Sequence, residues 1–234
     1  MPYTLRKLFR WESSLVASFF QLAIPIVIQS LVMASLHIID NVMIGQLGEM
    51  EMAAVTQANR LTFLFQLTIF GLSGATSTFV SQYWGKRDIG SIRQVQGLSL
   101  IVSGAIAILF MVLSIGFPLF VMRKFLREAP AIAMGAQYLQ IVGVGYLFQA
   151  LTQTYATVQK STEQPRLPMI ASIIAILTNT VLNYAFIFGR LGAPRLGIQG
   201  GAMATTIATG VEFLIVCLYG YRKKLASAAK LREL

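Results

Sequence analysis

Three side-chain types that carry much of protein chemistry are scarce in this chain of 234 residues: it has one cysteine, one histidine and nine acidic residues. With Cys217 as the only cysteine, an intrachain disulfide and a thiolate metal cluster are excluded. With His37 as the only histidine, the chain also lacks the usual ligand set of a zinc site. No nucleophile paired with a base is visible, so the sequence predicts neither an enzyme nor a bound cofactor.

Charge is scarce as well, because charged residues make up 12% of the chain and hydrophobic residues 56%. Soluble domains have about 25% charged residues, so this composition predicts a polytopic membrane protein with the lipid bilayer as its surroundings. The net charge of +10 does not indicate a nucleic-acid-binding protein. The basic residues lie between apolar runs and form no aromatic-interleaved surface, so we expect no nucleic-acid partner.

The first long run without a charge extends from Ser13 to Ile39 and ends directly before Asp40. As a helix these 27 residues would be about 40 Å long, which exceeds the ~30 Å hydrocarbon core of a bilayer and the length of a signal-peptide h-region. On a helical wheel, Gln29, Met33 and His37 share the face of Asp40, so we expect this face to look into protein or water. The alternative for Asp40 is a helix end at the lipid headgroups.

Charge-free windows predict six transmembrane spans, of which the last is interrupted only by Glu212. The spans cover residues 14–45, 61–84, 94–119, 131–158, 167–188 and 198–220. The expected fold class is therefore an all-α membrane protein whose six transmembrane helices form one bundle. We divide the chain into a cytoplasmic N-terminal segment at 1–12, the bundle at 13–221 and a basic cytoplasmic tail or linker at 222–234.

The distribution of Lys and Arg predicts that both termini are cytoplasmic. In that orientation the inside segments hold thirteen of these residues and the outside loops hold five. The outside five are Arg123, Lys124, Arg127, Arg190 and Arg195. This asymmetry agrees with the positive-inside rule.

Polar residues in the second and fourth spans are candidates for contact with a solute. Gln57 precedes the second span, and Tyr146, Gln149 and Gln153 recur along the fourth at spacings of three or four. Such a stripe either lines a solute path or forms hydrogen bonds between helices, and the sequence leaves both open. The small and hydroxyl residues at the end of the second span, from Gly71 to Ser81, we expect only to pack against another helix.

The fifth and sixth spans carry polar residues on one face each. Asn179 and Asn183 are an i, i+4 pair of amides, which can ligate a cation or donate to a carboxylate. In the sixth span, Thr209 shares a face with Glu212. An ionisable residue inside a span is costly unless it is used, so Glu212 is a candidate cation or proton site. The alternative is that Glu212 only pairs with a basic neighbour such as Arg60.

Short motifs spread along the chain occur in the order found in one transporter family. They are Leu22–Pro25 followed by Asp40–Gly48, then Val80–Asp88, Gln164–Met169 and Gly197–Thr205. Together they resemble the first six helices of the MATE (multidrug and toxic compound extrusion) transporters. The resemblance implies one lobe of a transporter that has twelve spans in two facing bundles.

The resemblance also implies roles for individual residues. Asp40 matches the first-helix acid that these transporters use as a proton or cation site, and Asn179 matches its partner on the fifth helix, so Na⁺ could bind at these two residues. Asn183 followed by Tyr184 stands where some branches of the family carry a second Asp followed by Pro. Glu212 is our substitute for that missing carboxylate, an inference from the residues and not from the family pattern.

The function implied is secondary active export of drug-like or organic cation solutes from a bacterial cell across its inner membrane, driven by Na⁺ or H⁺. The expected partner is a C-terminal six-helix lobe or a second half-chain. One alternative is a lipid-linked saccharide flippase, which needs a basic cavity to hold a pyrophosphate. The other is a non-transporting fragment or assembly subunit.

Overall fold

The computed structural model describes residues 13–222, in which seven α-helices follow one another along the chain. They are α1 (Ser13–Gly45), α2 (Glu49–Gly85), α3 (Ile89–Gly116), α4 (Pro118–Arg123), α5 (Ala129–Ser161), α6 (Arg166–Phe188) and α7 (Ile198–Arg222). The predicted N-terminal segment and nearly all of the predicted C-terminal tail lie outside the described residues. The same is true of the His37 side chain, although its backbone belongs to α1.

Six of the helices in the described part are long and apolar enough to cross a membrane, which confirms the predicted six-helix bundle. One boundary was wrong by a wide margin, because α2 begins at Glu49 and not at residue 61. A hydropathy window detects only the part of a helix inside the hydrocarbon, whereas the backbone hydrogen bonds continue outward through polar sequence. The six-residue helix α4 was not predicted at all.

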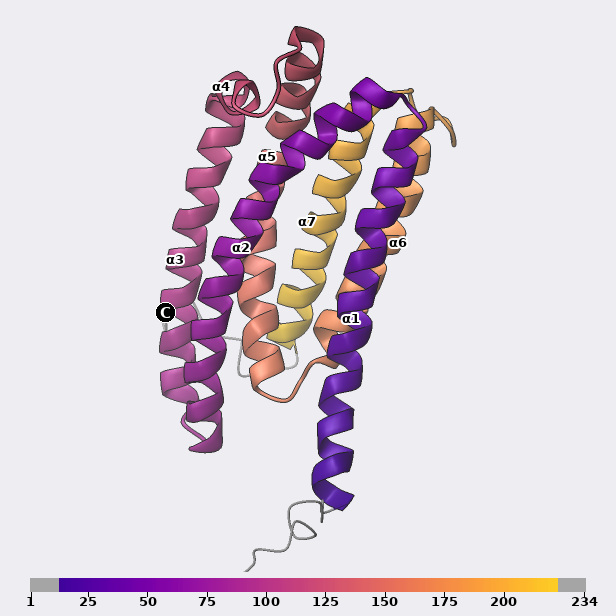
Figure 1. The fold of residues 1–234 in the computed structure, drawn as a ribbon. Helices are drawn as coiled ribbons and strands as arrows, with labels where there is room; N and C mark the ends of the chain where they lie inside the picture. The colour runs from indigo at the N-terminus through magenta and orange to yellow at the C-terminus, as the bar shows by residue number, and fades with distance from the viewer. Residues whose placement is uncertain (1–12, 223–234) are drawn as a thin grey trace, which may run out of the picture.

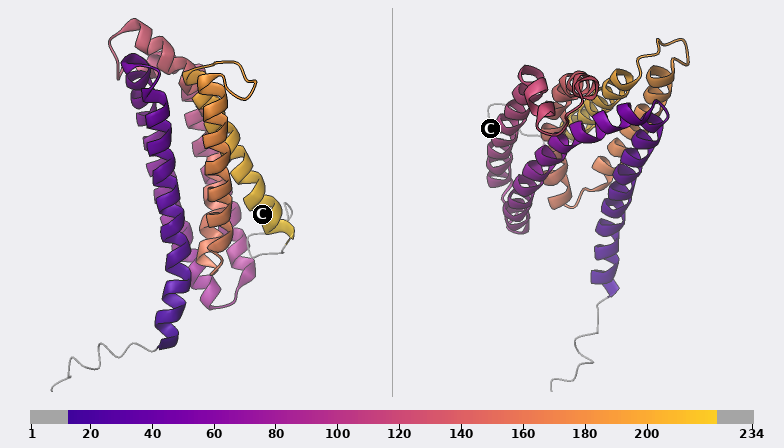
Figure 2. Two further views of the ribbon diagram at one scale, coloured as in Figure 1. Left: turned by 90° about the vertical axis from the view of Figure 1, so that its right-hand side faces the viewer. Right: turned by 45° about the horizontal axis from the view of Figure 1, so that its top comes forward.

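The helices form two groups that meet along α5 and α7. In the first group α5 packs against α2 and α3, and in the second α6 packs against α1 and α7. The helix α5 lies centrally, since it also packs against α7 along its length. Figures 1 and 2 show α1 and α2 lying in front of α5, α6 and α7, close together near the α1–α2 connection and apart at the other end.

Close approach between α5 and its neighbours depends on small residues. A Cβ atom at Gly145 would lie 3.3 Å from the Thr209 hydroxyl oxygen of α7, and one at Gly143 would lie 2.8 Å from the Ser114 Cβ of α3. Small residues allow membrane helices to approach without a hydrophobic driving force between them. Packing of this kind fixes α7 beside the central helix.

The small-residue end of α2, from Gly71 to Ser81, packs against the other described helices in part. Thr76 is buried and shares a 2.8 Å hydrogen bond with Ser99, and Ser77 shares one of 2.9 Å with Ser161, so part of this segment packs as expected. Gly71 and Gly74, by contrast, face open space, because a Cβ atom at either position would meet no atom within 4 Å. At Gly71 and Gly74, packing against another helix therefore stays a prediction.

The connections gather at the two ends of the bundle. Asp88 caps α3 in the α2–α3 turn, where its carboxylate accepts hydrogen bonds from the Ser91 amide at 3.0 Å and the Ser91 hydroxyl at 2.6 Å. These hydrogen bonds hold the pKa of the exposed Asp88 carboxyl below its ordinary value. At the opposite end, Gly189 terminates α6 in the left-handed conformation with φ of 68°.

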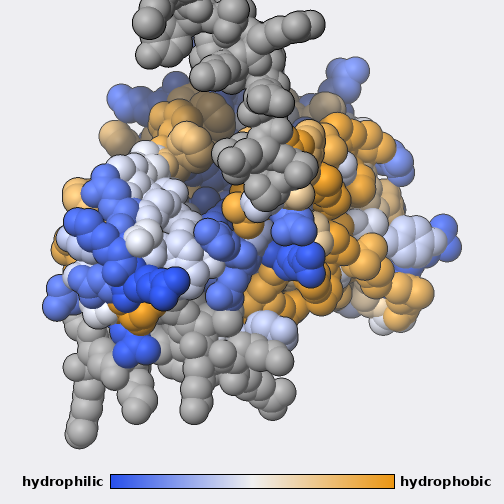
Figure 3. Space-filling view, turned by 90° about the horizontal axis from the view of Figure 1, so that it is seen from below, coloured by the Kyte–Doolittle hydropathy of each residue, from blue (hydrophilic) through white to orange (hydrophobic). Residues whose placement is uncertain are grey.

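The sides of the bundle are apolar and exposed. Phe63, Phe70, Ile101, Leu109 and Leu177 are each more than half exposed, although side chains of this size are normally buried in a soluble protein. Figure 3, which looks at the end where the α2–α3 turn lies, shows hydrophilic residues gathered at that end and apolar residues along the flanks. This distribution is that of a multi-pass membrane protein whose flanks contact lipid.

Candidate functional site

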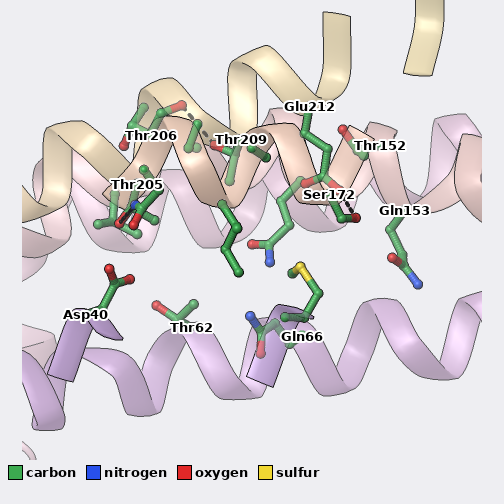
Figure 4. A pocket seen from close by; sticks show the side chains of 18 of the residues that line it. Asp40, Thr62, Gln66, Thr152, Gln153, Ser172, Thr205, Thr206, Thr209 and Glu212 are labelled. Atoms are coloured by element: carbon green, nitrogen blue, oxygen red, sulfur yellow. Dashed lines mark hydrogen bonds between the residues drawn. The ribbon is translucent and has the colours of Figure 1, made fainter. Parts of the chain in front are cut away.

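A pocket of about 420 Å³ lies between α1, α2, α5, α6 and α7. Its volume is within the range of about 300–1,000 Å³ that small-molecule sites occupy. Polar side chains from all five helices line it, and Figure 4 shows Asp40 toward one end of the pocket and Glu212 toward the other. Each of the two acids has its own group of hydrogen-bonded partners, which we call the Asp40 cluster and the Glu212 cluster.

The Asp40 cluster joins α1 to α6. Asn183 donates from Nδ2 to Asp40 Oδ1 at 2.5 Å and to Asn179 Oδ1 at 2.8 Å. Both asparagines are almost completely buried, because one α-helical turn places their side chains on the face that α6 turns toward α1 and α7. Asn183 is thus a direct partner of the carboxylate, in the place where the family resemblance led us to expect a second acid in some branches.

Asn179 can face Asp40 with either end of its amide. In the structure its nitrogen donates to the Thr205 hydroxyl at 3.3 Å. With the amide turned over, the nitrogen donates to Asp40 Oδ1 at 2.9 Å and the oxygen accepts from Thr205 at 3.3 Å. An amide has a donor and an acceptor of similar size, so the same position can serve a carboxylate or a carboxylic acid.

The Glu212 cluster joins α1, α6 and α7. The Ser172 hydroxyl donates to Glu212 Oε1 at 2.6 Å, and Gln29 Nε2 donates to the Ser172 hydroxyl at 2.9 Å. Lys160, in the last turn of α5, lines the same pocket and attracts Glu212 electrostatically. The basic residue that shares the pocket with Glu212 is therefore Lys160. The alternative that Glu212 pairs with Arg60 was wrong, since Arg60 lies over the Phe125 ring at 5.8 Å.

The two clusters are too far apart to share one ion. Asn183, which contacts Asp40, and Ser172, which contacts Glu212, are 11 residues apart on α6. A helix rises about 1.5 Å per residue, so these contacts are separated by about 16 Å along the axis. Even Asn179 and Ser172 differ by about 10 Å. The expectation that Asp40, Asn179 and Glu212 would surround a single cation is therefore wrong in its geometry.

Most of the predicted solute-contact residues line the pocket, namely Gln29, Met33, Tyr146, Gln149 and Gln153. Gln57 is not among the lining residues. The side chain of His37 lies outside the described residues. Thr209 lines the pocket and donates its hydroxyl hydrogen bond to the Thr206 backbone oxygen at 2.9 Å, so it belongs to neither cluster.

Sequence reasoning missed several lining residues, because some of them are uncharged and one lies at the end of a predicted span. Thr62 and Gln66 of α2 line the pocket, and only the packing of α2 beside α5 reveals that they face it. Lys160 was counted as a cytoplasmic cation that reports topology. A lysine near a helix end can extend its flexible stem toward a buried acid, and the sequence offers no signal for that direction.

A family model, MatE, matches residues 25–185 of the chain. The multidrug resistance protein NorM of Vibrio parahaemolyticus is 30% identical over 207 residues, which cover 87% of this chain and 44% of that protein. The chain therefore spans about half the length of this curated relative.

Solved structures give the same picture of the fold. An outward-facing multidrug resistance MATE family transporter of the MOP superfamily superposes with a TM-score of 0.83 at 20% identity, over 92% of this chain and 47% of that one. A MOP superfamily transporter from Pyrococcus furiosus gives the same four values. At this identity the structures establish the fold alone, namely that of one half of a transporter chain.

Proposed function

Because the chain belongs to the MatE family, we propose that it forms one lobe of a cation-coupled antiporter that exports drug-like or organic cation solutes. The observation that carries the proposal is the pocket between five membrane helices. Its described lining contains two acids, Asp40 and Glu212, and one basic residue, Lys160. An acidic, partly apolar pocket favours a positively charged, partly apolar solute. The relative named as a multidrug resistance protein supports the same solute class.

The coupling site in this proposal is the Asp40 cluster. As the structure stands, the Asn179 oxygen lies 2.9 Å from Asp40 Oδ1, so a protonated Asp40 would donate to it. With Asp40 ionised, the turned amide donates to the carboxylate instead, and the hydrogen bond from Asn183 to Asn179 is lost, because two amide nitrogens then lie 2.8 Å apart. The Asn179 amide thus offers Asp40 an acceptor in one orientation and a donor in the other, which suits a site that takes up and releases a proton.

Sodium is the second candidate for the coupling ion. The oxygens of Asp40, Asn179 and Thr205 lie together, and Asn183 Oδ1 is buried with no hydrogen-bond partner. Carboxylate, amide and hydroxyl oxygens are the ligands that can replace the water shell of a hard cation in transporters. Thr209 as a further ligand remains a prediction.

Transport requires a facing lobe, supplied in this proposal by a C-terminal six-helix bundle or a second half-chain. Occupancy of the Asp40 cluster by the cation and of the pocket by solute would then favour alternate outward-open and inward-open packings of the two lobes. We place the protein in the bacterial inner membrane with both termini cytoplasmic, as the Lys and Arg distribution predicts.

Two other functions fit the pocket less well. A lipid-linked saccharide flippase would need cations to hold a pyrophosphate, whereas the described lining contains Asp40, Glu212 and only Lys160. A non-transporting assembly subunit would have no use for two buried acidic clusters, which are costly to insert into a membrane.

The test is solute uptake into inside-out vesicles that contain the chain with and without its facing lobe, under an imposed H⁺ or Na⁺ gradient. We expect gradient-driven uptake of an organic cation dye only with both lobes, and its loss in Asp40→Asn, which keeps the shape of the side chain and removes the ionisable group. Asp88→Asn makes the same change on an exposed loop and should transport normally. Uptake by Asp40→Asn at the rate of the parent chain would refute the assignment.

A further inference from the structure

We propose that the Glu212 cluster is a second monovalent-cation site, separate from the Asp40 cluster, and that the Lys160 ammonium is a tethered competitor for it. The proposal concerns binding to this lobe alone and needs neither export nor a facing lobe. Its failure would leave the proposed function of the Asp40 cluster untouched.

The atoms of the Glu212 cluster that could ligate a cation are all oxygens. Ser172 already donates to the Glu212 carboxylate, and the Ser172 oxygen accepts from Gln29. The second atom of the Gln29 amide, Oε1, is buried with no hydrogen-bond partner, and the side chain is only 9% exposed. Leaving a buried acceptor without a donor is unfavourable, so a cation that binds to it and to the carboxylate would relieve this cost.

A second unpartnered oxygen lies in the same part of the pocket. Thr152 of α5 lines the pocket, and its hydroxyl oxygen is buried without a hydrogen bond. Figure 4 shows it toward the same end of the pocket as Glu212 and Ser172. The cluster therefore holds two buried oxygens, Gln29 Oε1 and Thr152 Oγ1, that no hydrogen bond occupies. A hard monovalent cation such as Na⁺ can bind to such oxygens together with the Glu212 carboxylate, because carboxylate, amide and hydroxyl oxygens can replace its water shell.

Only one positive charge among the described lining residues is available to balance Glu212. Among the described lining residues, Lys160 of α5 is the one basic residue, and α1, α2, α6 and α7 contribute none. The acid besides Glu212 is Asp40, which lies toward the other end of the pocket. Lys160 lines the same pocket as Glu212 and attracts it electrostatically, so in this proposal its ammonium balances the carboxylate when no other cation is present.

The position of Lys160 allows it to leave as well as to approach. It lies in the last turn of α5, and its side chain is only partly buried. A lysine side chain has a flexible four-carbon stem that can carry its charge to the water at the end of a membrane helix. A cation that enters the cluster would therefore displace Lys160 toward the bundle end, whereas a fixed ion pair would exclude the cation.

The experiment measures equilibrium binding of ²²Na⁺ to the purified full chain in the Asp40→Asn background, so that the Asp40 cluster does not contribute. We expect saturable binding that weakens at least ~10-fold in Glu212→Gln and tightens about 10-fold in Lys160→Gln, since each change removes one charge next to the ion. Glu163→Gln and Lys86→Gln make the same replacements at exposed residues outside the pocket and should leave the affinity unchanged.

Gln29→Met provides a second variant that changes no charge. It keeps the length of the side chain and removes the unpartnered oxygen together with the hydrogen bond from Nε2 to Ser172, so we expect Na⁺ to bind several-fold more weakly while the chain remains monodisperse. Equal Na⁺ affinity with and without Glu212→Gln, both in the Asp40→Asn background, would overturn the proposed site. Weaker or unchanged binding in Lys160→Gln would overturn the competitor, and Na⁺ binding that is absent in the parent chain and appears only in Lys160→Gln would identify a fixed ion pair instead.

Discussion

Tyr146 combines a packing role with a polar one, and a double-mutant cycle can separate them. Its side chain is 1% exposed, its ring lies 4.6 Å from the Phe65 ring between centroids, and Phe110 meets it edge-on at 6.4 Å. Its hydroxyl shares a 2.9 Å hydrogen bond with Thr62 of α2. This bond joins the central helix to α2 at the edge of the pocket.

The two contributions have different sizes. Tyr146→Phe keeps the ring contacts and removes only the hydroxyl, so the free energy of unfolding should fall by about 0.5–1.5 kcal/mol. Tyr146→Ala also removes the ring from a cluster of three aromatics, for which we expect a loss of about 3–5 kcal/mol. Thr62→Val breaks the same hydrogen bond from the other side.

The assay is reversible unfolding of the purified chain in mixed micelles of mild detergent and dodecyl sulfate. The double variant of Tyr146→Phe and Thr62→Val should be less destabilised than the sum of the two singles, with a coupling energy of about 0.6–1.5 kcal/mol. A coupling energy of zero would show that the hydrogen bond contributes nothing. A Tyr146→Phe loss as large as that of Tyr146→Ala would refute the division between ring and hydroxyl.

Three further predictions concern packing, charge and topology. Gly145→Val places new carbons against Thr209, so it should lower the free energy of unfolding by about 1–3 kcal/mol in the same assay. The pKa of Asp88 is lowered from 3.8 by its capping hydrogen bonds, so its contribution to stability is present above pH 3.8 and is lost as the pH falls through the lowered value. Asp88→Asn should remove this acid-side dependence of unfolding. In a chain whose native cysteine is replaced by serine, a cysteine at Glu163 should react only with reagents in the cytoplasm, and one at Glu49 only with reagents outside; the reverse pattern would invert the topology.

Much of the fold could be predicted because a helix that spans a bilayer needs a long run of apolar residues, and such runs are visible in the sequence. The run from Ser13 to Ile39 has no charge and became the first spanning helix, and the other five charge-free windows also lie within long helices. The start of α2 could not be found in this way, since Glu49 and Arg60 lie on the same helix beyond its apolar part.

The site was predicted in part for a similar reason. Helical periodicity places Asn179 and Asn183 on one face, but it says nothing about which neighbouring helix meets that face. The hydrogen bond between Asn183 and Asp40 depends on α1 packing beside α6, and the approach of Lys160 to Glu212 depends on α5 packing beside α7. Such pairings between helices are tertiary contacts, which helical periodicity does not reveal. For this reason the sequence analysis offered Arg60 as a partner for Glu212 and grouped Glu212 with Asp40.

The central claim is that this lobe couples movement of a cation to movement of a solute through the Asp40 cluster. The most direct measurement imposes a gradient of organic cation solute, with no ion gradient, on proteoliposomes that hold the chain and its facing lobe, and records Na⁺ and H⁺ flux. The account predicts that one of the two ions moves opposite to the solute and that this flux disappears in Asp40→Asn. Solute movement without any ion flux, or an unchanged ion flux in Asp40→Asn, would contradict it.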